Sequence, residues 1–192
     1  MTNTGELSSV FGLLGSMYLC QPVKETVEKW RMLLRGGVSP IFADLREAME
    51  GISLESEREM EDLLWDYTKL FIGPYKLPCP PWESVYASPK KLMMQESYDA
   101  VSGFYLQAGL SIGDPNVLID HVGAELSFLA VLYGKMESEP EGSRRYGEMA
   151  ERFLAEHLKK WIPSFTMDME SAAVSRFYKT LARTTRDLIA AG

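Results

Sequence analysis

Apolar residues recur at intervals of three and four along most of the chain. Leu7, Val10, Phe11 and Leu14 are an example near its start. This spacing places apolar side chains on one face of an α-helix. The same pattern, with its glycine and proline stops, predicts helices over about 6–20, 23–35, 40–50, 55–71, 89–109, 115–133, 149–162 and 170–190. No stretch alternates apolar and polar residues at every second position, so we expect an all-α protein of about eight to ten helices.

The chain of 192 residues has the length of a single domain with a buried core. We therefore expect one multi-helix bundle over residues 1–192, with a linker or hinge at 134–143, where Pro140 and Gly142 interrupt the helical pattern. The segment that follows Pro115 is apolar on more than one side, which predicts the most buried helix of the bundle.

Between two of the helical patterns lies a proline-rich loop, residues 73–89. Prolines fix φ and remove backbone donors, so the loop is expected to be stiff and neither helix nor central strand. It carries five prolines and three aromatic residues: Pro74, Pro78, Pro80, Pro81, Pro89, Tyr75, Trp82 and Tyr86. Trp82 is predicted either to anchor a binding partner or to pin the loop onto the helices.

The chain is acidic, with 20 Lys and Arg against 27 Asp and Glu and a net charge of −7. This charge disfavours binding to nucleic acid and is better matched by a cationic partner. Cys20 and Cys79 form neither a disulfide framework nor a metal-ligand spacing, which indicates a reducing cytoplasm. The start of the chain resembles neither a signal peptide nor a membrane span, so stable membrane insertion is not expected.

Asp120 and His121 fall in the second turn of the helix predicted from Pro115, where they form either structural hydrogen bonds or a binding site. His121 and Glu125 share a face of that helix, but two residues are an incomplete metal site. Ser84 and Cys79 lack the context of a catalytic nucleophile, and no glycine-rich phosphate loop is present. We therefore expect no catalytic residue, no metal and no resident cofactor.

Three motifs together resemble the TorD/DmsD/NarJ family of cytoplasmic chaperones for redox enzymes. The first is Leu70-Phe71-Ile72-Gly73-Pro74 running into Pro80-Pro81-Trp82-Glu83-Ser84-Val85-Tyr86. The others are Asp120-His121-Val122-Gly123 and the segment from Phe153 through His157 to Trp161. The resemblance covers roughly residues 6–190 and is strongest to the DmsD-like branch.

This resemblance implies an all-helical chaperone that binds the twin-arginine signal peptide of a molybdenum-cofactor enzyme of the DMSO reductase type. Such a chaperone withholds the catalytic subunit from Tat export until its cofactor is inserted. The residues that the resemblance implies in peptide recognition are Leu70, Phe71, Pro81, Trp82, Tyr86, Asp120 and His121. The need for carboxylates opposite arginine adds Glu83 beside Asp120. Because the helix from Pro115 is apolar on several faces and needs cover, we expect the loop 73–89 to lie against it, with Trp82 close to Asp120 and His121.

Other functions remain open at this point. One is a NarJ-like assembly factor that binds the mature enzyme and ignores its signal peptide. Another is a small helical nucleotide hydrolase, which the missing phosphate loop disfavours, and a third is a dimeric scaffold without a client. The sequence also leaves open contacts with a guanine nucleotide or the molybdenum cofactor, and the choice between a monomer and a domain-swapped dimer.

Overall fold

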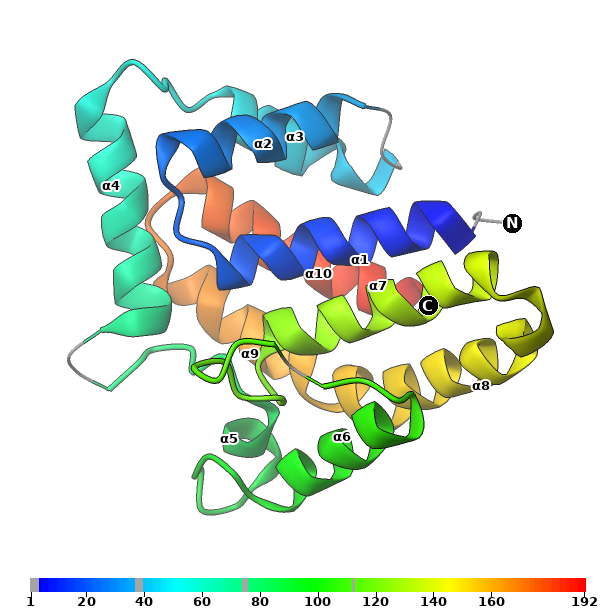
Figure 1. Ribbon diagram of the computed structural model, residues 1–192. Coiled ribbons are helices and arrows are strands. Elements are labelled where there is room, and N and C mark those ends of the chain that lie inside the picture. The colour runs from blue at the N-terminus through cyan, green and yellow to red at the C-terminus, as the bar shows by residue number, and fades with distance from the viewer. Residues whose placement is uncertain (1–3, 37–39, 74–75, 112) are drawn as a thin grey trace. The chain divides into compact units, whose positions relative to one another are not determined.

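The computed structural model describes residues 4–36, 40–73, 76–111 and 113–192, and in these ranges the chain is helical (Figure 1). No strand occurs there, which confirms the all-α prediction. The α-helices are α1 (Thr4–Leu19), α2 (Lys24–Arg35), α3 (Ala43–Glu50), α4 (Glu57–Tyr67), α5 (Glu83–Ala87), α6 (Glu96–Gln107), α7 (Val122–Ser138), α8 (Ser143–Phe153), α9 (Lys159–Ala172) and α10 (Arg176–Ala191). Short 3-10 or π turns are η1 (Pro40–Phe42), η2 (Thr68–Ile72), η3 (Pro140–Gly142) and η4 (Leu154–Leu158). Within the described ranges, no helix is both long and apolar enough to cross a membrane.

The chain folds into two compact units. The first unit contains Met1–Leu19 and Pro81–Trp161, and the second contains Cys20–Pro80 and Ile162–Ala191. The first unit thus holds α1 and α5 to α8, while the second holds α2 to α4, most of α9, and α10.

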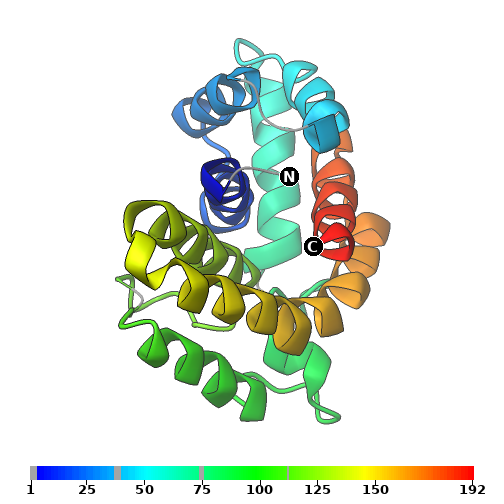
Figure 2. The ribbon, with the colours of Figure 1, turned by 90° about the vertical axis from the view of Figure 1, so that its right-hand side faces the viewer.

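In the first unit, α7 lies between α1 and α8, as both ribbon views show (Figures 1 and 2). α1 and α7 approach closely at two glycines, because a Cβ at Gly15 would stand 2.8 Å from the carbonyl oxygen of Gly123. The Ser8 hydroxyl donates to the carbonyl oxygen of Ala130 at 2.8 Å, which ties the two helices together further along. Small residues therefore set the spacing of this helix pair.

Aromatic rings join α6, α7 and α8 in the same unit. Tyr105 of α6 stacks on Phe128 of α7, with ring centroids 4.4 Å apart. Phe128 in turn meets Phe153 of α8 edge to face at 4.8 Å, and Phe104 meets Phe153 at 5.2 Å. Aromatic pairs at these separations add to the stabilisation by apolar burial. They form a core beside the start of α7.

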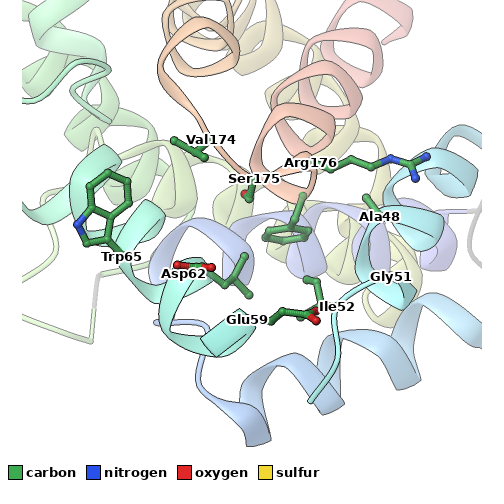
Figure 3. Close-up of a pocket in the computed structure, with 11 residues that line it drawn as sticks. Ala48, Gly51, Ile52, Glu59, Asp62, Trp65, Val174, Ser175 and Arg176 are labelled. Atoms are coloured by element: carbon green, nitrogen blue, oxygen red, sulfur yellow. The ribbon is translucent and has the colours of Figure 1, made fainter. Parts of the chain in front are cut away.

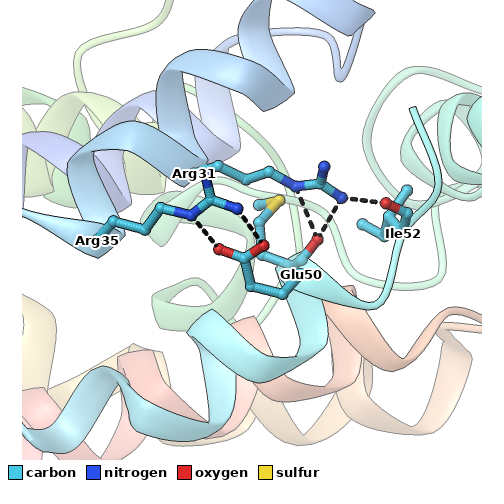
Figure 4. A network of polar contacts seen from close by, with 5 residues as sticks. Arg31, Arg35, Glu50 and Ile52 are labelled. Carbon is cyan, nitrogen blue, oxygen red and sulfur yellow. Dashed lines mark hydrogen bonds and ion pairs between the residues drawn. The ribbon is translucent and has the colours of Figure 1, made fainter. Parts of the chain in front are cut away.

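In the second unit, two arginines of α2 hold the end of α3 (Figure 4). Arg35 binds Glu50 through two nitrogens, each 2.6 Å from a carboxylate oxygen. Arg31 donates to the carbonyl oxygens of Met49 and Ile52. These carbonyls lie at the C-terminal end of α3, where a helix leaves acceptors without internal partners. The segment after α3 is thereby fixed to α2.

Several helix boundaries differ from the sequence prediction. Glu83–Ala87 forms α5, although we expected no helix over 73–89, because Pro81 and Pro89 flank this helix rather than interrupt it. Pro74 and Tyr75 of the same loop lie outside the described residues. α6 begins at Glu96 rather than near Pro89, since Lys91 and Met94 adopt φ values of 52° and 56° that a helix cannot contain.

α7 begins at Val122, not near Pro115, and Asp120 therefore precedes the helix instead of lying in its second turn. A local turn replaces the expected first turns, with the Asp114 carboxylate accepting from the backbone N–H of Asn116 at 2.9 Å. α7 also continues through the first half of the expected 134–143 linker and ends at Ser138. Further on, α9 runs through Pro163 to Ala172 and α10 begins at Arg176, whereas we expected a new helix near residue 170.

Candidate functional site

A short antiparallel bridge joins the proline-rich loop to the start of α7 in the first unit. It pairs Trp82 with His121. The backbone N–H of Val122 donates to the carbonyl oxygen of Pro81 at 2.8 Å, and that of Glu83 donates to the carbonyl oxygen of Asp120 at 2.9 Å. The structure thus brings together the segments that carry two of the sequence motifs, and Trp82 lies beside His121 as we expected.

Asp120 caps the short helix α5 from outside that helix. Its carboxylate oxygen Oδ2 accepts from the backbone N–H of Ser84, at 3.1 Å, in the first turn of α5. An N-cap side chain usually performs this role for the helix that directly follows it in the sequence. Asp120 is fully buried, and this burial raises the pKa of its carboxyl. Its other oxygen, Oδ1, has no hydrogen-bond partner in the structure.

His121 caps the next helix, α7. Its ring nitrogen Nδ1 accepts from the backbone N–H of Gly123 at 3.1 Å. Burial lowers the pKa of His121 to about 4, so the ring is neutral near pH 7 and carries its proton on Nε2. The indole of Trp82 meets this ring edge to face, with centroids 6.2 Å apart. The adjacent residues Asp120 and His121 therefore cap two different helices.

The candidate residues of the first unit form an exposed part and a buried part. Trp82, Tyr86 and His121 are partly exposed, whereas Pro81, Glu83 and Asp120 are buried. Tyr86 lies 5.7 Å from the buried indole of Trp161, centroid to centroid. The surface that a ligand can reach is therefore aromatic. The expectation that Asp120 and Glu83 offer charge to an arginine does not agree with these positions, because both carboxyls are enclosed.

Beneath this surface lies a buried polar network that includes residues from α7 and η4. The Glu83 carboxylate contacts Nδ1 of His157 at 2.8 Å, and both side chains are almost fully buried. Glu125 accepts from the indole N–H of Trp161 at 3.0 Å. Burial and the nearby charge of Glu83 raise the pKa of Glu125 well above its usual range. The other oxygen of Glu125, Oε1, is buried without a hydrogen-bond partner, which also favours the protonated, neutral carboxyl over the carboxylate.

In the sequence, Glu125 and His157 lie in or near the motifs, but no pattern there connects them with Glu83. Glu83 and His157 are 74 positions apart, so no local spacing relates them. One usable signal was present. Polar or amphipathic residues recur within otherwise apolar helical stretches at Glu125, His157 and Trp161, and such residues need hydrogen-bond partners when they are buried.

Leu70 and Phe71 lie in the second unit and belong to its core. Both are buried, and Phe71 packs edge to face on Tyr67 at 5.4 Å and on Tyr178 at 5.8 Å. Cys79, whose thiol approaches the carbonyl oxygen of Leu70 at 3.6 Å, is also buried, and burial raises its pKa to about 12. The predicted site residues are thus divided between the two units.

The part of the chain that the structure describes contains no group of three or more His, Cys, Asp or Glu side chains that could hold a metal ion. The buried carboxyls of the first unit accept from backbone or side-chain donors instead. The expectations of no metal and no catalytic residue stay predictions.

The family model described as the nitrate reductase delta subunit matches residues 19–167. Among curated relatives, the "Probable Tat proofreading chaperone DmsD" of Haemophilus influenzae is 27% identical over 96% of this chain and 89% of its own length. The "Chaperone protein YcdY" of Escherichia coli is 27% identical over 97% of this chain and 93% of its own length. The "Tat proofreading chaperone DmsD" of Salmonella typhi is 32% identical over 66% of this chain and 58% of its own length.

A solved structure also resembles this chain. It is described as a "Putative Redox Enzyme Maturation Protein" from Archaeoglobus fulgidus, and it superposes with a TM-score of 0.67 and is 20% identical. The match covers 99% of this chain and 96% of that chain, and it supports the same fold.

Proposed function

Because this chain belongs to the nitrate reductase delta subunit family, which confirms the family predicted from its sequence, we propose that it is a cytoplasmic chaperone for a redox enzyme. In this proposal it binds the twin-arginine signal peptide of the catalytic subunit and delays Tat export until the cofactor is inserted. The relatives named Tat proofreading chaperones support a binding role, not catalysis. We propose a molybdopterin enzyme of the DMSO reductase type as the client.

One observation carries the proposed binding site, namely the bridge that presents Trp82 beside His121 on a base of buried hydrogen bonds. A partly exposed aromatic side chain on a pre-ordered backbone loses little conformational entropy when a partner binds. The apolar segment of a signal peptide is a suitable ligand for such a surface. We propose that Trp82, Tyr86 and His121 contact the peptide.

The buried members of the predicted set have a different proposed role. Pro81, Glu83 and Asp120 position the contact residues, since Asp120 and Pro81 supply acceptors for the bridge and for α5. Leu70 and Phe71 influence binding through the packing of the second unit. We also propose that the two units function as one chaperone domain.

Calorimetric titration tests this function with a synthetic peptide that carries an Arg-Arg pair followed by an apolar segment. Trp82→Ala should weaken binding by about 2 kcal/mol, about thirtyfold, because truncating an aromatic anchor removes most of its contact area. The loss should persist at high salt, since the contact is apolar. Met32→Ala removes an exposed apolar side chain of α2 and serves as the control.

Both variants must first show the helical circular dichroism and the melting temperature of the parent. If the folded parent does not bind the peptide, the proposed function is wrong. If Trp82→Ala binds as tightly as Met32→Ala does, the function stands but this site does not.

The family description favours a second candidate, an assembly factor that binds the mature part of the enzyme without its signal peptide. A pull-down with the catalytic subunit lacking its signal peptide separates the two functions. Undiminished capture of the truncated subunit, together with no binding of the isolated peptide, would select the assembly factor.

A further inference from the structure

A pocket of about 500 Å³ opens in the second unit, between α4, the end of α3 and the start of α10 (Figure 3). Its buried apolar lining consists of Ala48, Leu63 and Phe177. Asp62 and Trp65 of α4 line one side, and Val174 in the α9–α10 connection lines another. None of the residues proposed above to contact the peptide lines this pocket.

The walls of the pocket are fixed by hydrogen bonds. The buried Asp66 carboxylate accepts from the backbone N–H groups of Val174, at 3.1 Å, and Ser175, at 2.8 Å, and so holds the connection before α10. Glu59 accepts from the backbone N–H of Ser53 at 2.7 Å, which ties the segment after α3 to α4. The Arg31 contacts in Figure 4 hold the same segment to α2. A pocket with fixed walls needs little reorganisation when a ligand binds.

Large apolar side chains are exposed at its opening. Trp65 is 59% exposed and Val174 is 63% exposed. Lys69 already places its ammonium group 5.4 Å from the centre of the Trp65 ring, so this indole accepts a cation. An exposed tryptophan beside a preformed apolar pocket is typical of a binding hot spot.

The charges at the opening favour a cationic ligand. Asp62 has a long contact with Arg58, 3.9 Å, and both side chains are well exposed. Glu59, on the same helix, also lines the pocket. Two cations lie nearby: Arg176 is paired with Glu47 at 2.9 Å, which offsets its charge, and the Lys69 ammonium donates to the carbonyl oxygen of Ala172 at 2.7 Å. An anionic ligand would meet two carboxylates, whereas a guanidinium can bond to a carboxylate and stack on an indole.

We propose that this pocket binds an arginine side chain of the client's twin-arginine signal peptide together with an adjacent apolar residue. The inference rests on the proposed function for the presence of such a peptide. In this arrangement the guanidinium contacts Asp62 over the Trp65 indole, and the apolar neighbour enters toward Phe177. The pocket thereby supplies the accessible carboxylate that the enclosed Asp120 and Glu83 do not offer.

Titration of the Arg-Arg peptide into charge variants of α4 tests the proposal. Asp62→Asn should weaken binding about fivefold to tenfold, a modest loss because the carboxylate is solvated. Glu61→Gln is the matched control, since it removes the same charge from an exposed neighbour that does not line the pocket. Arg58→Ala should tighten binding about twofold to threefold, because it removes a competing cation near Asp62.

Trp65→Ala should weaken binding about tenfold or more, with Met32→Ala as the control for loss of an exposed apolar side chain. A Lys-Lys peptide should bind the parent more weakly and should respond less to Asp62→Asn, because an ammonium lacks the planar fork of arginine. These results together support the arginine pocket.

Two results would overturn it. Equal affinities of the parent, Asp62→Asn and Trp65→Ala for the Arg-Arg peptide would remove the site, even if Trp82→Ala still weakened binding and the proposed function stood. If Asp62→Asn loses the same affinity for the Arg-Arg peptide as for the Lys-Lys peptide, Asp62 attracts any cation and does not recognise arginine. Absence of any binding by the parent would instead reject the proposed function itself.

Discussion

Replacing Glu125 by Gln should make the protein more stable at neutral and alkaline pH. Glu125 is fully buried on α7, accepts from the indole N–H of Trp161 and faces the carboxyl of Glu83. Glutamine has nearly the same shape and keeps an oxygen for the indole. Its amide nitrogen takes the place of Oε1, which has no hydrogen-bond partner in the native structure. The substitution therefore removes an ionisable group while retaining the hydrogen bond to Trp161.

The size of the effect follows from the raised pKa of Glu125. The unfolded chain leaves this carboxyl near its ordinary value of 4.5, whereas burial and Glu83 raise its pKa in the native state. Between the two values the native state keeps a proton that the unfolded state has released. The contribution of Glu125 to the free energy of unfolding of the parent therefore falls by about 1.4 kcal/mol per pH unit as the pH rises through this window. Below the window both states are protonated and the contribution of Glu125 is constant.

Glu125→Gln does not have this dependence, so its advantage over the parent should grow by about 1.4 kcal/mol per pH unit and level off above the native pKa. A constant offset of about 1 kcal/mol against the variant is expected, because the glutamine amide places N–H donors at a buried position where Oε1 of Glu125 has no hydrogen-bond partner. The raised pKa of Asp120 and the lowered pKa of His121 affect parent and variant alike and cancel in the difference.

Urea unfolding followed by circular dichroism between about pH 4.5 and about pH 8 measures this difference. Glu141→Gln, at an exposed position in η3, controls for the loss of a carboxylate. A difference between Glu125→Gln and the parent that stays flat over this range would show that Glu125 is already ionised in the native protein. The account of the buried network would then be incorrect.

Three further outcomes are expected. His121→Asn keeps an N-cap acceptor for the N–H of Gly123 but cannot titrate. The contribution of His121 to the stability of the parent decreases as the pH falls from about 6.5 toward 4, and urea unfolding should show that this decrease is absent in the variant. Gly15→Ala should lower the free energy of unfolding by about 1–3 kcal/mol, because its methyl group would collide with the backbone of Gly123, and a thermal melt would show this. Asp66→Ala should cost about 2–4 kcal/mol, since it leaves two backbone N–H groups before α10 without acceptors, and unchanged unfolding would contradict that role.

Helical periodicity was sufficient to predict the all-α fold, because each amphipathic helix must bury the face that its sequence defines. It was not sufficient to place helix starts after Ser88-Pro89 and Asp114-Pro115. Both pairs have the composition of a helix start, but turn geometry follows each of them. A local sequence signal does not reveal whether a later residue, here His121, offers a better cap.

The sequence predicted which segments meet at the candidate site better than it predicted the roles of their residues. The proline-rich loop and the Asp-His motif do meet, through the bridge between Trp82 and His121. The burial of Glu83 beside His157 depends on how segments 74 positions apart pack, which periodicity does not encode. The pocket beside Trp65 likewise depends on Asp66 reaching residues 108 and 109 positions further along the chain.

The positions of Asp120 and His121 change how substitutions in this motif should be understood. Asp120 caps α5 on one side of Trp82, and His121 caps α7 and contacts the indole directly. A change at either residue alters the backbone that presents Trp82, whether or not the peptide touches it. Reduced binding after substitution of Asp120 therefore does not identify a contact, because loss of the cap on α5 predicts the same result. Trp82→Ala leaves the acceptors of both caps in place but removes the indole that meets the His121 ring. Reduced binding by this variant therefore identifies a contact only when its melting temperature matches that of the parent.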